Sequence, residues 1–177
     1  MVLLSFLFGG IWGLIQGVAL VVTRDKGILP NKAIYHGLNP IINALRSLPF
    51  FILAIAVIPL TKWIVGSSIG TWAAIVPLTI FIGPYMGRLI ETSLLEVNDG
   101  IIESAQAMGA TPWQIVFKFI LPEARSSLIL NMTTATISLI GATAMAGAVG
   151  AGGIGDLAYS YGYQRFDMQI MVAVILV

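Results

Sequence analysis

The sequence predicts an all-α polytopic membrane protein that forms a single domain over residues 1–177. Hydrophobic residues make up 58% of the chain and charged residues only 10%, whereas a soluble domain carries roughly a quarter charged residues. The charges are also segregated, since none occurs in residues 1–23, 47–61, 63–87, 126–155 and 168–177. A chain of this composition cannot cover a water-facing surface, so we expect it to lie in a lipid bilayer.

The charge-free runs locate the helices, because a membrane span needs about 20 apolar residues. We expect helices at about 2–22, 39–61, 69–92, 124–148 and 166–177. The first lacks the basic start and the small-residue cleavage site of a signal peptide, and Gly13 and Gly17 suit close helix packing. It is therefore predicted to be a retained span.

Charged residues in the second and third helices are expected near the helix ends. Arg46 lies near the start of the second and Arg88 near the end of the third, where basic side chains can extend to the lipid headgroups. Arg88 and Glu91 are three residues apart, so they can also pair.

The last predicted helix is short. Twelve residues reach about 18 Å, against a hydrocarbon core of about 30 Å. We therefore expect the last helix to be truncated and the sequence to be a fragment, with part of the first helix missing as well.

The distribution of Lys and Arg predicts the orientation. Seven of the nine basic residues lie in or beside the segments 24–38 and 93–123, and only Lys62 and Arg165 lie in the other loops. The two basic segments should face the cytoplasm, and the N-terminus and a loop at 149–165 should face outside.

Several chemistries are excluded or disfavoured by residue content. The chain has no cysteine and one histidine, His36, so disulfides, thiolate metal sites, a cysteine nucleophile and a histidine zinc cluster are excluded. We predict no catalytic residue and no bound metal or cofactor. Gly150 to Gly155 spell G-x-G-x-x-G, but no strand precedes them, so a tight turn is the better interpretation.

The segment 93–123 carries the most distinctive local pattern. Gly109 should end one short helix, and Thr111-Pro112-Trp113-Gln114 should begin another through a capping box. We expect two helices around a glycine hinge, with Leu121-Pro122 ending or kinking the second. The first has an apolar side formed by Ile101, Ile102, Ala105 and Met108. That side suits a partner's groove or a lipid surface, and the residues alone favour neither.

This pattern resembles the cytoplasmic EAA loop of ABC importer permeases. Glu103, Ala105 and Gly109 match its first part and Leu121-Pro122 its end, while Ser104 and Phe119 depart mildly from the usual residues. The resemblance implies a coupling helix that docks on a separate ATPase subunit, and its expected docking residues are Glu103, Ala105, Gly109, Ala110, Leu121 and Pro122. The chain has no Gly-Lys dipeptide and hence no Walker A motif, so ATP would be hydrolysed by that partner.

Other stretches resemble methionine-uptake permeases over essentially the whole chain. They are Asn43 to Phe50, Ala74 to Thr79, Ala107 to Pro112, Gly147 to Gly155 and Tyr159 to Tyr163. The resemblance implies a five-helix, type I permease core in a bacterial inner membrane, acting as a homodimer with two ATPase subunits. It also implies an external substrate-binding protein, which we expect to dock near 62–68 and 153–165. The implied function is methionine import.

Two alternatives stay open at this level. One is a permease for another small amino acid or other small solute, because methionine rests on the resemblance alone. The other, from a different class, is a secondary transporter. No Asp or Glu lies at mid-span, which argues against proton coupling. A structural scaffold would not need the two-helix insert, and an intramembrane enzyme is disfavoured.

The fourth predicted helix is rich in hydroxyl and amide side chains. Such residues serve helix packing or line a wet translocation path. The candidate path residues are Asn131, Thr134, Ser138 and Met145. Met145 has a flexible, polarizable side chain that could close a narrow path. We expect two copies of this helix to approach each other near Ala142 to Met145.

Overall fold

A computed structural model describes residues 1–176, which contain helices and connecting segments but no strand. They form two compact units. Unit 1 comprises Met1–Phe8, Leu48–Ile82 and the chain from Thr136 onward, and unit 2 comprises Gly9–Ser47 and Gly83–Ala135. The boundaries between the units fall inside long helices as well as between helices, and the prediction of a single domain stays a prediction.

Three helices are long and apolar enough to span a membrane. They are α1 (Val2–Thr23), α5 (Thr71–Leu95) and α9 (Arg125–Ala146), the last continuing through the wider turn η2 (Gly147–Ala151). The helices predicted at 2–22, 69–92 and 124–148 are thereby confirmed. Within residues 1–176, a fourth span is possible only if α2 and α3 together form one bent span.

The continuous helix predicted at 39–61 is wrong. Three helices occupy this region, namely α2 (Lys32–Ser47), α3 (Phe50–Ala56) and α4 (Ile58–Val65). Pro49 explains the first break, because the residue before a proline avoids helical geometry. The early start of α2 at Lys32 also shortens the loop predicted at 24–38.

The loop predicted at 149–165 is also wrong in part. Residues 154–163 are helical, as α10 (Ile154–Leu157) followed by the wider turn η3 (Ala158–Tyr163). Tyr159 and Tyr163 stack at a ring distance of 5.8 Å one turn apart. The final helix α11 (Met168–Leu176) begins two residues later than predicted, and position 177 lies outside the described residues.

Glycines allow α1 and α5 to approach closely within unit 2. A side-chain carbon added at Gly17 would lie 2.7 Å from the carbonyl oxygen of Gly87. One added at Gly13 would lie 2.8 Å from the carbonyl oxygen of Gly83. The predicted role of Gly13 and Gly17 in close helix packing is confirmed.

Candidate functional site

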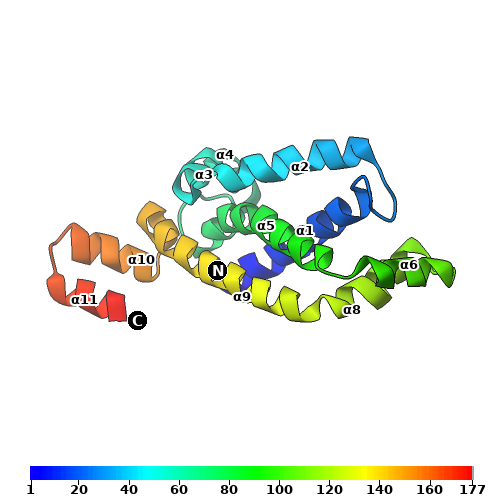
Figure 1. Cartoon of the computed structure of the whole chain (residues 1–177). Coiled ribbons are helices and arrows are strands. Elements are labelled where there is room, and N and C mark those ends of the chain that lie inside the picture. The colour runs from blue at the N-terminus through cyan, green and yellow to red at the C-terminus, as the bar shows by residue number, and fades with distance from the viewer. Residues whose placement is uncertain (177) are drawn as a thin grey trace. The chain divides into compact units, whose positions relative to one another are not determined.

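The segment that joins α5 to α9, here called the insert (residues 96–124), contains α6 and α8 (Figure 1). It folds as predicted around a glycine hinge at Gly109. Its first helix is α6 (Asp99–Ala107), capped by the side chain of Asn98, which accepts a hydrogen bond from the Gly100 amide at 2.8 Å. Gly109 has a left-handed φ of 76°. Its amide donates to the Gln106 carbonyl, and the Ala110 amide donates to the Ala105 carbonyl at 3.0 Å. These two bonds form the Schellman turn that glycine favours.

The second helix of the insert begins with the predicted capping box. The Thr111 amide donates to Gln114 Oε1 at 2.8 Å, and the Gln114 amide donates to Thr111 Oγ1 at 3.4 Å. The helix runs through α7 (Pro112–Gln114), η1 (Ile115–Ile120) and α8 (Leu121–Glu123). In η1 the Leu121 amide bonds to the Val116 carbonyl, five residues back. This widened turn lies just before Pro122, which has no amide hydrogen to continue the helix.

The apolar side of α6 faces its own chain. Ala105 is fully buried, and Ile101 and Ile102 pack against the same cluster, whereas Met108 is 70% exposed. The buried members of this cluster are Val21, Ile90, Leu94, Val97, Ala105, Ile115, Ile120 and Ala124. Ala105, Ile101 and Ile102 are thus wholly or partly covered within unit 2, whereas Met108 is exposed, and the expectation that this side of α6 meets a partner or lipid stays a prediction.

Part of the surface of the insert is exposed within the described residues. Glu103, Met108 and Gly109 are exposed there. Of the other predicted docking residues, Pro122 is exposed, Ala110 and Leu121 are half-buried, and Ala105 is buried. Met108 is joined on the surface of the insert by two further large apolar side chains, Trp113 at 72% and Phe117 at 51% exposure. The buried residues of the insert support this surface from behind.

The loop after α1 lies beside the insert. Arg24 and Asp99 approach to 3.9 Å between Nη2 and Oδ1. Together with Lys26, Glu103 and Gln106 they line a groove of about 490 Å³. The two segments predicted to share the cytoplasmic side are thus neighbours in unit 2, although their sequence separation gave no direct sign of this contact.

The ionic group at the end of α5 involves residues that the sequence did not single out. The predicted pair of Arg88 and Glu91 is confirmed by a contact between Nη1 and Oε2. Arg88 also donates to Asn39, and to Asn43 at 2.8 Å between Nη2 and Oδ1. Its side chain is only 21% exposed and is held by these partners, and the expectation that it extends to the headgroups stays a prediction. The signal in the sequence was the spacing of Asn39 and Asn43, one helical turn apart on α2.

The candidate path residues on α9 have different environments. Asn131 donates to Ser93 Oγ at 2.7 Å and to the Leu89 carbonyl at 3.3 Å, which fastens α9 to α5 within unit 2. Thr134 is exposed, and its hydroxyl donates to the Leu130 carbonyl of its own helix. Ser138 is half-buried, and Met145 is 53% exposed.

The chain matches a known family along nearly its whole length. Residues 6–177 match the binding-protein-dependent transport system inner membrane component family. A Vibrio cholerae relative, described as a probable D-methionine transport system permease protein MetI, is 46% identical over 176 residues, which is 99% of this chain and 78% of the relative. The D-methionine transport system permease protein MetI of Escherichia coli is 48% identical over 147 residues, 83% of this chain and 68% of the relative.

Solved structures give the same picture of the fold. An inward-facing structure of the MetNI methionine ABC transporter matches with a TM-score of 0.97 and 47% identity, covering 99% of this chain and 82% of the other. An amino acid ABC transporter crystallised with histidines matches with a TM-score of 0.71 at 17% identity, over 99% of this chain and 81% of the other. The second likeness concerns the fold alone. The chain has the fold of a type I ABC importer permease.

Proposed function

Because the chain belongs to the family of inner membrane components of binding-protein-dependent transport systems, we propose that it is the membrane subunit of an ATP-driven methionine importer. It is a multi-pass inner membrane protein and a permease subunit rather than an enzyme. The observation that carries the proposal is the match to a methionine transporter at 47% identity over 99% of this chain.

The proposed coupling site is the exposed side of the insert. Two ATPase subunits would each receive one insert, with Glu103 and Gly109 at the contact and Ala110, Leu121 and Pro122 around it. The rigid support of this surface favours the proposal, because the buried side chains of α6 and η1 hold it in place. ATP would be bound by the ATPase, and this chain would need no cofactor of its own.

The remaining parts of the proposal concern a second copy and an external partner. Two copies would form the path between them, with Thr134, Ser138 and Met145 of α9 along it and Asn131 at its start. A substrate-binding protein would dock on the outer surface near residues 62–68 and 153–165. The exposed Trp63, at 83% exposure, offers a large contact residue in the first of these segments.

Uptake by reconstituted vesicles tests the function. The chain would be purified with its ATPase, placed in vesicles with ATP inside, and supplied with the external binding protein and labelled methionine of either hand. We expect uptake that requires both ATP and the binding protein. Uptake driven by an ion gradient without ATP would contradict the proposal and favour a secondary transporter. ATP-dependent uptake of another solute, with none of methionine, would contradict the substrate.

A further inference from the structure

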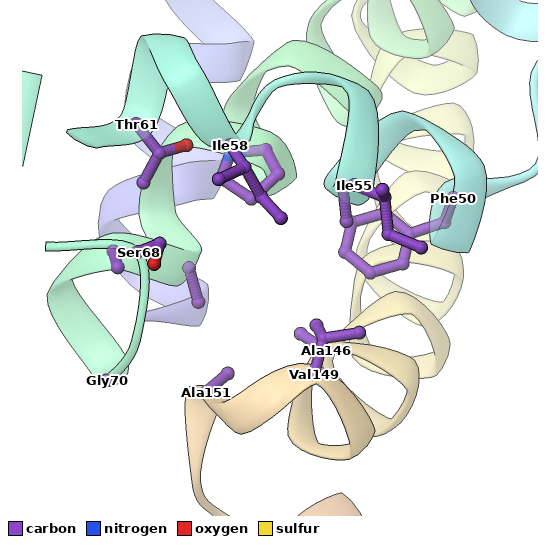
Figure 2. A pocket seen from close by; sticks show the side chains of 13 residues that line it. Phe50, Ile55, Ile58, Thr61, Ser68, Gly70, Ala146, Val149 and Ala151 are labelled. Atoms are coloured by element: carbon purple, nitrogen blue, oxygen red, sulfur yellow. The ribbon is translucent and has the colours of Figure 1, made fainter. Parts of the chain in front are cut away.

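A small, partly open cavity in unit 1 is not used by any contact described so far. It has a volume of about 60 Å³ and lies between α3, α4, the start of α5 and the end of α9 (Figure 2). The helices around it are interrupted, because α3 gives way to α4 at Val57, and Val149 and Gly150 leave helical geometry in η2. Non-helical backbone at membrane depth is tolerated where it is buried in protein or lines a cavity. In transporters, such discontinuous helices often form substrate sites.

The lining of the cavity has an apolar side and a hydroxyl-bearing side. Figure 2 shows Phe50 and Ile55 on one side and Thr61 and Ser68 on the other, with Ile58 between them. Phe50 and Thr61 are almost fully buried, and the Thr61 hydroxyl donates to the Val57 carbonyl at 3.0 Å. None of the lining residues is charged. The cavity therefore suits a neutral, mainly apolar group.

Backbone and side-chain hydrogen bonds hold the cavity open in a fixed form. The Gly70 amide donates to the Gly150 carbonyl at 2.8 Å, and Thr71 Oγ1 donates to the Ala151 carbonyl at 3.3 Å. These bonds tie the start of α5 to the end of η2. The space exists because small residues such as Ala54 and Ala146 line it. A preformed site of this kind orders little on binding, which favours recognition.

The size of the cavity fits the end of a short, unbranched side chain. An engineered apolar cavity of about 150 Å³ holds benzene, which has six carbons, so a volume of about 60 Å³ holds about two or three non-hydrogen atoms. A methionine side chain consists of two methylenes, a sulfur and a methyl group, and its flexibility lets it enter a narrow apolar space. An aromatic side chain is too wide, and a charged one would find no partner there. We propose that this cavity receives the terminal S-methyl end of the thioether side chain of the transported amino acid, an inference that rests on the proposed function.

Two substitutions of opposite effect test the proposal. Ala54→Leu fills the cavity, since Ala54 lines it and is 6% exposed. Ile58→Ala enlarges it. The control is Ala56→Leu, which makes the same change on the same helix at an exposed position that does not line the cavity. Each variant would be reconstituted with the ATPase and the binding protein, and uptake measured for methionine, S-methylcysteine (one methylene shorter) and ethionine (one methylene longer).

Uptake ratios isolate the contribution of the membrane subunit. The binding protein is the same in every sample, so its own preference cancels when a variant is compared with the unmodified complex. We expect Ala54→Leu to raise the ratio of S-methylcysteine uptake to methionine uptake about tenfold. Ile58→Ala should raise the ratio of ethionine uptake to methionine uptake by a similar factor. The reason is that one methylene in a fitted pocket changes recognition at least about tenfold. Ala56→Leu should leave both ratios unchanged.

The contrary outcomes separate the subsite from the function. Equal loss of all three substrates in both cavity variants, or ratio changes that also appear in Ala56→Leu, would overturn the subsite. If Ala54→Leu fails to assemble, the ratio for Ile58→Ala decides alone. If the unmodified complex imports methionine normally and no ratio moves, only the subsite is wrong. If it imports no methionine, the proposed function fails and the subsite fails with it.

Discussion

Helices α5 and α9 are both long and apolar enough to span a membrane, yet they have very different surroundings. In the most hydrophobic stretch of α5, 56% of the residues are buried, against 17% in α9. The Arg88 and Ser93 side chains on α5 are held by partners from α2 and α9, whereas Thr133 and Thr134 on α9 donate to the backbone of their own helix. Apolar composition therefore predicts that a helix spans the membrane but not what it faces. The exposed side of α9 is free for lipid or, as proposed above, for a second copy.

The largest expected effect on stability comes from substituting Gly17, which packs against α5, in contrast to Gly141 on α9. Gly17→Ala places a carbon 2.7 Å from the Gly87 carbonyl oxygen and 2.9 Å from Ile90 Cβ, atoms that cannot rotate away. We expect it to destabilise the fold by about 1–3 kcal/mol or more through overpacking. The same change at Gly141 on α9 meets no atom within 4 Å, and should be neutral or stabilising by up to about 1 kcal/mol. Thermal unfolding in detergent measures both.

The two glycine variants test directly whether α9 has a surface that its own chain does not cover. If Gly141→Ala lowers the melting temperature of the isolated chain as much as Gly17→Ala does, then α9 is packed against its own chain on that side, and its surface is not free. If Gly17→Ala is neutral, the close contact of α1 with α5 does not limit stability. A Gly141→Ala variant that is stable but fails to assemble as a dimer would instead indicate that this surface of α9 contacts a second copy.

The insert that joins α5 to α9 gives the next largest effect. Gly109 adopts a left-handed φ of 76°, which a β-branched residue adopts only at a cost of order 1–3 kcal/mol. Gly109→Val should therefore lower ATP-dependent uptake about tenfold or more by distorting the exposed side of the insert, while membrane insertion remains normal. Gly109→Asn is the control, since asparagine tolerates this conformation. Co-purification of the ATPase and uptake provide the readouts, and normal values for Gly109→Val would contradict the coupling role.

The sequence was most informative where a local rule acts alone. The glycine stop at Gly109, the capping box at Thr111 and the ion pair of Arg88 with Glu91 each depend on residues within four positions, and all three were predicted. The long spans followed from apolar runs of sufficient length. The docking and path roles of the candidate residues remain predictions, because they concern contacts with other subunits and not contacts within this chain.

The sequence-based predictions failed where an apolar run or a glycine cluster outweighed another local signal. They also missed contacts between segments that are distant in the sequence. The apolar run at 39–61 concealed the break at Pro49, and the glycines around 150–155 suggested a loop where residues 154–163 are helical. The bonds from Arg88 to Asn39 and Asn43, and the cavity near Ala54, join segments that no sequence period relates. Periodicity gives the faces of a helix but not the partner of each face.

A smaller effect on stability is expected from substitutions on the buried and exposed sides of α9. Asn131→Ala removes two hydrogen bonds to α5, from the Asn131 amide to Ser93 and to the Leu89 carbonyl. We expect a loss of about 1 kcal/mol, as for hydrogen bonds between membrane helices. Thr134→Ala, three residues later, removes only a bond to its own helix and should change stability by less than about 0.5 kcal/mol. Equal losses in detergent unfolding would show that both sides of α9 contribute alike.

The smallest effect on stability, and the sharpest test of what α9 faces, is expected at Met145. Its side chain is 53% exposed, so Met145→Cys should change the free energy of unfolding by no more than about 0.5 kcal/mol. The chain has no cysteine of its own, so no disulfide can form within one copy of this variant, and a cross-link between two copies is recognised by its mass. If the two copies of α9 approach each other along the path, the introduced thiol should cross-link between subunits, and the yield should change when ATP is added. Ala135→Cys, at a fully buried position on the same helix, is the control and should not cross-link. If the Met145→Cys variant reacts only with lipid-soluble reagents and never cross-links in any nucleotide state, then α9 faces lipid, and the proposed path must lie elsewhere.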